Sequence, residues 1–307
     1  MAKKRFKIKT SFQRYWFLYI LIAPGVVSLA IFAYVPMLFQ IIMAFTNYTF
    51  ADGIFGSSFA GIENFRYVFT SMHNFGRILG NTLFFSLFDF IFGFFPPLIL
   101  AVMLFDLFSP IFRKVAQTVL YIPYFFSWVI VYSIAYGILS NTGMLNSLIT
   151  ALGGTARDFL TNPRAIRTIL YVTSTWKGVG WGTIIYLAAM QSIDVTLYEA
   201  AKIDGCGPWR RSFCITLPGI KGIIMYLMIF TFGGIFNGGN TEQILLFYNP
   251  AVASKTQTIG IWLYEVLGDL DSYSYGASLS FVQSTMGMIL VITANMYMSK
   301  KQGVSIW

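Results

Sequence analysis

The chain has 307 residues, of which 56% are hydrophobic, 18% aromatic and only 11% charged. Soluble domains usually carry about 25% charged residues, so this composition excludes a water-soluble globule and predicts a membrane protein. The net charge of +9 lies between the apolar blocks and forms no basic patch interleaved with aromatic residues, so we interpret it as a topology signal and not as a sign of nucleic-acid binding.

Six apolar blocks are long enough to cross a bilayer as helices, which predicts an all-α fold with six transmembrane spans. These blocks are residues 17–45, 78–105, 115–139, 169–190, 220–236 and 277–298. The first is too long for a signal peptide and lacks a clean cleavage site, so we expect it to remain as a span. The fifth ends in a run of glycines and asparagines, which predicts irregular backbone that faces protein or water. We expect one membrane domain over residues 1–307.

The basic residues predict the orientation of these spans. With the N-terminus inside, cytoplasmic segments carry 14 Lys and Arg residues and the outer loops carry 6. The positive-inside rule then places both termini in the cytoplasm. Cys206 and Cys214 match no zinc or redox spacing, and His73 is the only histidine, so we expect no metal site.

The third span carries a group of aromatic residues that could line a solute path. In the third span, Tyr121, Tyr124 and Trp128 follow a spacing of i, i+3 and i+7, which puts them on one helical face, and Pro123 and Ser127 lie between them in mid-span. This face is either an interfacial aromatic belt or part of a solute path. The sequence leaves both interpretations open.

The fourth span contains Lys177 near its middle, where a charge costs roughly 2.5–3.5 kcal/mol on insertion scales. Such a residue normally faces a bundle interior or a water-filled cavity, although it could instead reach the outer interface. Trp181 lies one turn further on the same face, and Gly178 with Gly182 forms a small-residue pair that allows close helix approach. Asp89 in the second span is a candidate for a cavity or for an ion pair, with Lys177 as one possible partner.

The loop at about 191–219, between the fourth and fifth spans, carries a regularly spaced motif. Leu197, Ala200, Ala201 and Asp204 fall close together on a helical wheel, and Gly205 can end the helix in the left-handed conformation. From this chemistry alone, the segment could be an ordinary amphipathic connector on the membrane surface.

The spacing of the motif resembles the EAA loop of the permeases of binding-protein-dependent ABC importers. In that pattern Glu-Ala-Ala is followed after three residues by Gly and after nine more by Ile-x-Leu-Pro, and seven positions match here: Glu199, Ala200, Ala201, Gly205, Ile215, Leu217 and Pro218. The stretches 117–128, 143–146, 176–189 and 237–239 are similar to the branch that carries oligosaccharides and polysaccharide fragments.

The resemblance implies a type I permease fold in the bacterial cytoplasmic membrane. The chain would be the non-catalytic permease subunit of an oligosaccharide importer, and because it has no GxxxxGK[ST] loop, ATP with Mg would be bound by a separate ATPase chain. The implied partners are a second permease, expected to be a different chain, two ATPase subunits and an extracytoplasmic solute-binding protein. A short helix would sit in a cleft of the ATPase and transmit its motion through Glu199, Ala200, Ala201, Asp204 and Gly205.

The resemblance also directs attention to a path for sugar, which binds aromatic faces and polar groups. The candidate residues are Tyr121, Tyr124, Ser127, Trp128, Lys177, Gly178, Trp181, Asn237 and Asn240. Two alternatives remain. An ABC permease for a peptide, amino acid or ion shares the EAA loop, whereas a secondary sugar transporter would show inverted repeats and paired broken helices, which the sequence does not display.

Overall fold

The computed structural model describes residues 8–70, 74–107, 109–266, 268 and 273–302. The chain divides into two compact units, one formed by residues 1–72 with 266–282 and the other by 73–265 with 283–307. The expectation of one membrane domain over the whole chain therefore stays a prediction. Among the residues used above for topology and metal binding, Lys3, Lys4, Arg5, Lys7 and His73 lie outside the described residues.

The smaller unit begins with a long helix that is kinked at Tyr15. It consists of α1 (Ile8–Leu29), a π-helical turn η1 (Ala30–Tyr34) and α2 (Val35–Ala44), and it contains the first predicted span. The helix is followed by a small antiparallel hairpin of β1 (Thr46–Asn47) and β2 (Ser58–Phe59), which encloses α3 (Gly53–Gly56) and precedes α4 (Glu63–Thr70). The side-chain amide of Asn64 donates to the carbonyl oxygens of Ala44 and Thr46, so α4 satisfies carbonyls where the long helix ends.

The last long helix, α17 (Tyr273–Gln302), starts in the smaller unit. Its first turn accepts a hydrogen bond of 2.8 Å from the backbone N–H of Tyr48 to Ser274 Oγ. Tyr275 stacks on Tyr67 with ring centres 4.0 Å apart, and Phe281 makes an edge contact with Phe45. Aromatic contacts therefore attach the hairpin region to the sixth predicted span, which is longer than the sequence suggested.

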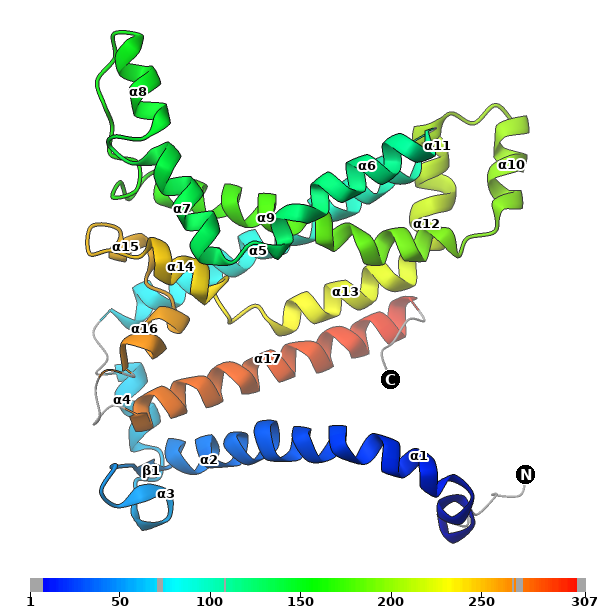
Figure 1. Ribbon diagram of the computed structural model, residues 1–307. Coiled ribbons are helices and arrows are strands. Elements are labelled where there is room, and N and C mark those ends of the chain that lie inside the picture. The colour runs from blue at the N-terminus through cyan, green and yellow to red at the C-terminus, as the bar shows by residue number, and fades with distance from the viewer. Residues whose placement is uncertain (1–7, 71–73, 108, 267, 269–272, 303–307) are drawn as a thin grey trace. The chain divides into compact units, whose positions relative to one another are not determined.

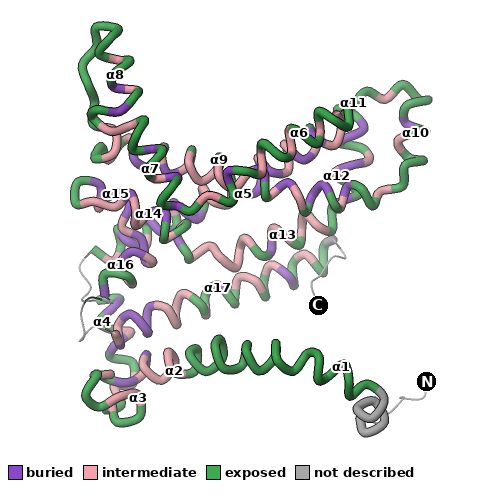
Figure 2. Tube along the Cα trace, viewed as in Figure 1, coloured by how far each residue is buried: buried purple, intermediate pink, exposed green. Residues whose placement is uncertain are grey.

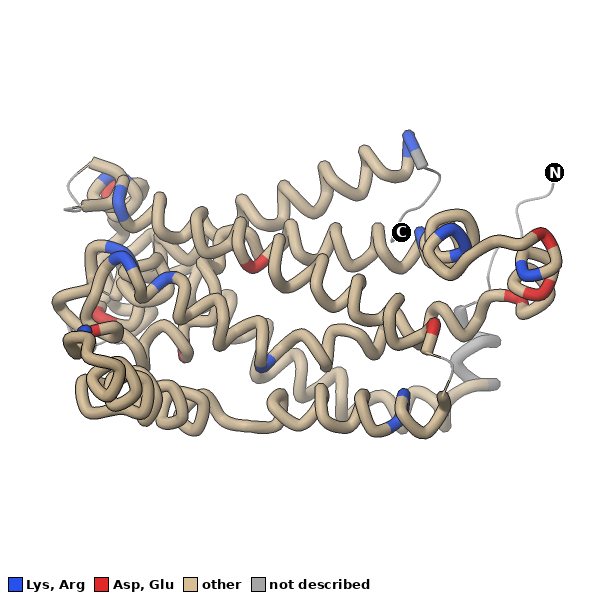
Figure 3. The backbone as a smooth tube through the Cα atoms, turned by 90° about the horizontal axis from the view of Figure 1, so that it is seen from above, with Lys and Arg blue, Asp and Glu red and all other residues tan. Residues whose placement is uncertain are grey.

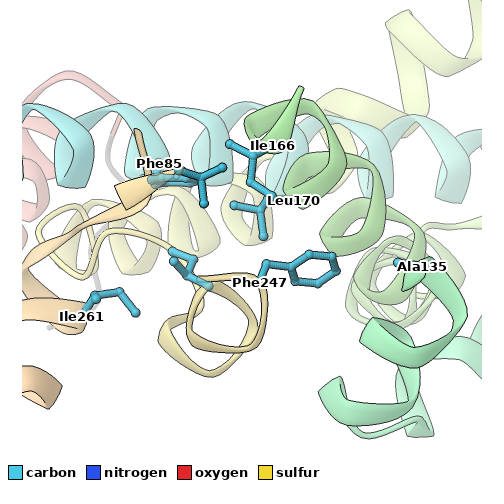
Figure 4. Packing of buried hydrophobic residues seen from close by; sticks show 8 residues of the cluster. Phe85, Ala135, Ile166, Leu170, Phe247 and Ile261 are labelled. Carbon is cyan, nitrogen blue, oxygen red and sulfur yellow. The ribbon is translucent and has the colours of Figure 1, made fainter. Parts of the chain in front are cut away.

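Two long helices form the centre of the larger unit: α5 (Phe75–Phe105) and α9 (Ile166–Gln191), the second and fourth predicted spans (Figure 1). They run parallel, because the start of α9 packs near Phe85 and its end packs near Ala101. The first cluster is Phe85, Ala135, Ile166, Leu170, Ile244, Phe247, Val252 and Ile261 (Figure 4). The second is Ala101, Leu104, Tyr186, Leu187, Met190 and Ile220.

The third predicted span is not one helix. The chain forms α6 (Pro110–Tyr121), a 3-10 turn η2 (Ile122–Phe125), α7 (Trp128–Leu139) and α8 (Met144–Ala151), and α7 turns away from α6 at the break in Figure 1. Pro123 lacks a backbone N–H, and Ser127 is extended and caps α7 by accepting from the N–H of Ile130. The prediction that residues 121, 124 and 128 share one helical face is therefore wrong.

Short helices follow α9. They are α10 (Val195–Ile203), α11 (Pro208–Arg211), a π-helical turn η3 (Ser212–Thr216) and α12 (Leu217–Gly219), which lead into α13 (Lys221–Gly233). Beyond the fifth span come α14 (Thr241–Phe247), α15 (Ala253–Thr256) and α16 (Ile259–Val266).

The predicted irregular backbone after the fifth span is confirmed, and it faces protein. Gly238 and Gly239 adopt φ values of +71° and +87°, and Gly238 is buried. Its N–H donates to Ser86 Oγ over 3.1 Å, and the N–H of Ile259 donates to Thr82 Oγ1 over 2.9 Å. Hydroxyl groups of α5 thus supply the hydrogen bonds that lipid cannot provide.

The number of spans depends on α9 and on the bent helix pair that forms the fifth predicted span. Among the described residues, four helices are long and apolar enough to cross a membrane, namely 15–44, 75–105, 128–151 and 273–301. The pair 208–219 and 221–233, bent by 67°, adds a fifth if it crosses as one span. Helix α9 is not among them, but its 26 residues extend about 39 Å, enough for a bilayer core. If α9 and the bent pair both cross the membrane, the number of spans among the described residues is six. Figure 3 shows that the charged residues lie mainly near the helix ends.

The contact of α6 with α9 generates a prediction about packing. A Cβ atom on Gly180 would overlap the carbonyl oxygen of Leu120, whereas a Cβ on Gly178 would meet no atom within 4 Å. We expect Gly180→Val to destabilise the protein by about 1–3 kcal/mol or more, because a backbone carbonyl cannot yield as a flexible side chain does. The measurement is the temperature at which the detergent-solubilised protein loses its monodisperse chromatographic peak. Gly178→Ala is the matched control, and an equal loss in both variants would contradict the assigned contact.

Candidate functional site

A cluster of aromatic rings and one lysine lies at the break between α6 and α7. The rings of Tyr124 and Trp181 stack with centres 4.3 Å apart and planes 4° from parallel. Lys177 Nζ donates to the carbonyl oxygen of Tyr124 over 2.6 Å, and it lies 5.0 Å from the Tyr124 ring centre and 5.4 Å from that of Trp128. The structure therefore brings together Tyr124, Trp128, Lys177 and Trp181, which the sequence singled out. The single helical face proposed for Tyr121, Tyr124 and Trp128 is nevertheless wrong.

Lys177 has a structural partner inside the protein. Its ammonium binds a carbonyl of the 3-10 turn, and two aromatic faces lie within cation–π distance. This contact favours the bundle interior over the outer interface, which was the alternative interpretation. The suggested ion pair with Asp89 is also wrong, because among the described residues no ion pair joins these two side chains.

Asp89 lies instead on a cavity of about 240 Å³ between α5 and α9. Tyr171, Ser174, Thr175 and Gly178 line the same cavity. Within the described part of the chain, no hydrogen bond or ion pair is recorded for the Asp89 carboxylate, so the cavity interpretation holds. Sequence reasoning missed Ser174 and Thr175, although their position one turn before Gly178 could have indicated a polar face of α9.

The two glycines predicted to allow close helix approach have different surroundings. A Cβ on Gly182 would lie 2.9 Å from Pro97 of α5, whereas Gly178 borders the open cavity. Helix approach at Gly182 is confirmed, and the same role for Gly178 is wrong. The glycine that meets α6 most closely is Gly180, which the sequence analysis did not select.

The remaining candidates for a solute path have local partners elsewhere. The Thr183 hydroxyl donates to the phenol of Tyr121 over 3.4 Å, and Asn237 Oδ1 accepts from the side chain of Gln283 over 3.1 Å. Ser127 and Asn240 act as N-caps of α7 and α14. These contacts explain how the four residues are held, and their participation in a path stays a prediction.

The motif in the loop after α9 forms the helix that the sequence predicted. Asp194 begins α10 by accepting from the N–H of Thr196 over 2.9 Å, and this backbone hydrogen bond lowers the pKa of the Asp194 carboxyl. Gly205 ends the helix with φ +72°, and the N–H of Cys206 returns to the carbonyl of Ala201 over 2.8 Å. The left-handed glycine cap is thus confirmed.

One side of α10 is anchored within the chain. Ala201 is buried, and the Tyr198 hydroxyl lies 3.0 Å from the hydroxyl of Thr216 in η3. Burial raises the pKa of Tyr198, so the phenol stays neutral and keeps its proton for this hydrogen bond. Ala201 therefore contributes packing against its own chain.

The other side of α10 is exposed, as Figure 2 shows along most of its length. Val195 and Ile203 are 65% and 88% exposed, and Leu197 is 52% exposed. Glu199, Ala200 and Asp204 are exposed too. A short helix that presents large apolar side chains and two acidic groups, while its other side is fixed, has the character of a docking element.

The chain matches one protein family over most of its length. Residues 93–297 match the family described as binding-protein-dependent transport system inner membrane component. The chain is 36% identical over 302 residues to the polygalacturonan/rhamnogalacturonan transport system permease protein YteP of Bacillus subtilis (strain 168), which covers 98% of this chain and 92% of that protein. Protein LplB of the same organism is 36% identical over 301 residues, covering 98% and 93%.

A solved structure has the same fold. A chain in the crystal structure of a bacterial alginate ABC transporter, in complex with an alginate pentasaccharide-bound periplasmic protein, matches with a TM-score of 0.86. The two chains are 30% identical, and the match covers 98% of this chain and 100% of that one.

The exposure of the aromatic cluster can be tested with thiol chemistry. After Cys206 and Cys214 are replaced by Ser, we expect a hydrophilic maleimide to label Cys at Tyr124 or Trp181, whose side chains are 38% and 43% exposed. A Cys at Ile99 of α5, 55% exposed and outside the cluster, is the comparison that tests whether exposure alone suffices. Failure of both cluster positions to react in every assembly state would place them in lipid or dry packing.

Proposed function

Because the chain belongs to the family of binding-protein-dependent transport system inner membrane components, we propose that it is the permease subunit of an ABC importer for oligosaccharides. Proteins of this family are the membrane components of ABC transporters, so ATP hydrolysis belongs to a separate subunit. The observation that carries the proposal is α10, which is anchored on one side and exposes apolar and acidic groups on the other.

Helix α10 is the proposed contact with the ATPase. Its exposed residues Leu197, Glu199 and Ile203 would enter a cleft of that subunit, while Tyr198 and Ala201 hold the helix to its own bundle. Because α10 follows α9 after only three residues, a displacement of α10 reaches the helix that carries Lys177 and Trp181. This connection is a physical basis for coupling ATP hydrolysis to alternating access.

The aromatic cluster is the proposed contact with cargo. Each of the rings of Tyr124 and Trp181 covers one face of the other, and both side chains remain partly exposed. An exposed aromatic ring suits stacking against the C–H surface of a sugar ring. The names of the relatives support this cargo class, since YteP is a polygalacturonan/rhamnogalacturonan permease and the similar solved structure belongs to an alginate transporter. An ABC permease for a non-sugar solute would also carry a helix like α10, but no relative named above supports such a cargo. A secondary transporter has no ATPase and would not need α10.

The proposed assembly contains this chain, a second and different permease, two ATPase subunits that bind ATP and Mg, and an extracytoplasmic solute-binding protein. The match to a transporter solved with its periplasmic protein supports a partner of that last kind. Both termini and α10 would lie in the cytoplasm of a bacterial cell, in agreement with the excess of Lys and Arg on that side.

The coupling proposal is tested at the end of α10. We expect Gly205→Pro to abolish both uptake and binding-protein-stimulated ATPase activity, because proline cannot adopt φ +72° and cannot donate the bond from Gly205 N–H to the Lys202 carbonyl. Gly207→Ala is the control, because Gly207 has φ −67° and a Cβ there meets no atom within 4 Å. Wild-type stimulation of the ATPase by the Gly205→Pro transporter, measured at equal membrane content, would refute the role of α10.

The cargo proposal is tested at Trp181. Stacking of a nucleic-acid base on an aromatic side chain is worth about 1–3 kcal/mol, and we take a similar value for a sugar ring. Trp181→Ala should therefore lower the efficiency of oligosaccharide uptake roughly tenfold. Trp181→Phe keeps an aromatic face and should retain most of the activity. Because α10 is unchanged, binding-protein-stimulated ATPase activity should fall less than uptake does. A parallel fall of both activities in the Ala variant would show that Trp181 is a packing residue of the bundle.

A further inference from the structure

A basic cavity of about 450 Å³ lies between α10 and the ends of α5 and α9, away from the aromatic cluster. Of the exposed apolar residues of α10, Val195 also lines it. Its charged side chains come from four segments: Asp106 after α5, Arg113 in α6, Lys202 in α10 and Arg211 in α11. Three cations thus face one carboxylate. Among the described residues, none of these four groups takes part in an ion pair.

Both arginines that line this cavity, Arg113 and Arg211, have a guanidinium N–H without a hydrogen-bond acceptor. Arg211 is only 9% exposed, its buried Nε has no hydrogen-bond acceptor, and no other hydrogen bond is recorded for its guanidinium. Arg113 donates through Nη2 to the carbonyls of Phe105 and Leu107, at 2.9 and 2.6 Å, but its buried Nε also lacks an acceptor. Buried charged donors without acceptors are costly, so an anionic ligand with several oxygens would satisfy the site.

The single carboxylate of the cavity is already engaged. Asp106 accepts a hydrogen bond of 3.0 Å from the hydroxyl of Ser212, and it lies beyond ion-pair distance of either arginine. The cavity therefore retains an excess of positive charge. Guanidinium groups pair with carboxylate and phosphate alike. With three cations around the cavity, a phosphate group fits better because it offers more acceptor oxygens than a carboxylate does.

The walls of the cavity indicate where the phosphate comes from. Phe105 and Met190 lie at the last turns of α5 and α9, two bilayer-length helices, so the cavity is at the level of the lipid headgroups. Beside it, Ile111 and Phe112 of α6 are 76% and 59% exposed and offer an apolar surface for an acyl chain. Basic groups between membrane helices at this depth suit anionic headgroups.

We propose that this cavity binds the phosphate of an anionic phospholipid through Arg211, Arg113 and Lys202. The bound headgroup joins α6, α10 and α11 through these three side chains. It thereby holds α10 from the side that faces the bundle. The binding itself does not depend on the function proposed above, whereas the consequence for coupling rests on that function.

The binding is tested on the delipidated full-length chain by native mass spectrometry with phosphatidylglycerol and, as the zwitterionic comparison, phosphatidylcholine. Arg211→Gln should weaken phosphatidylglycerol binding roughly fivefold to tenfold, the effect of about one surface charge or slightly more. Arg210→Gln is the matched control, since Arg210 is the exposed neighbour in the same helix and does not line the cavity. It should change the affinity less than twofold.

Lys202→Gln provides a second variant that removes no buried side chain, and it should weaken binding in the same direction. The proposal is overturned if Arg211→Gln binds as the wild type does, or if Arg210→Gln loses as much affinity. Displacement of the lipid by millimolar inorganic phosphate would reassign the site to soluble phosphate compounds and overturn the lipid assignment. Loss of the lipid when the ATPase subunit is added would show that the partner's acidic groups fill the cavity, which also overturns it.

Discussion

Backbone groups inside a bilayer must find hydrogen-bond partners within the protein, and the larger unit is organised around this constraint. Two of the places where the chain leaves helical geometry are the break at η2 and the irregular backbone between α13 and the start of α16. In both places a side chain from one of the central helices provides the missing partner. Lys177 of α9 binds the carbonyl of Tyr124, and Ser86 and Thr82 of α5 bind the N–H groups of Gly238 and Ile259.

These partners also position the candidate site. The lysine that satisfies the broken third span lies beside Trp181 because both are on one face of α9, so the structural contact and the exposed aromatic stack form together. One turn earlier on α9, Ser174 and Thr175 open onto the cavity that contains Asp89. Helix α9 is more polar than α5 and α13, and it carries the lysine and hydroxyl groups that contact the broken third span and the cavity.

The same helix connects the site to α10. The chain passes from Gln191 at the end of α9 to Asp194, the cap of α10, and then through Gly205 and η3 into α13. The hydrogen bond between Tyr198 and Thr216 closes this path from the other side. A force applied to the exposed face of α10 is thus transmitted to two helices, and a headgroup in the basic cavity would resist that force from behind.

Most of what the sequence determined about this protein is local. Apolar length located α5, α13 and α17 to within a few residues, and Gly205 fixed the end of α10 because its left-handed conformation depends on one residue alone. The spacing of the EAA loop identified the family before any contact was known. These features depend on composition, chain length and backbone sterics, all of which can be read along the chain.

Tertiary structure decided which side chains meet. Apolar content in 115–139 could not reveal that the chain breaks at Pro123 and Ser127, because the carbonyl of Tyr124 at this break finds its partner, Lys177, on another helix. The opposite environments of Gly178 and Gly180 depend on where α6 crosses α9. Arg113, Lys202 and Arg211 served in the sequence only as topology signals, and they became a site because the folded chain places four distant segments around one cavity.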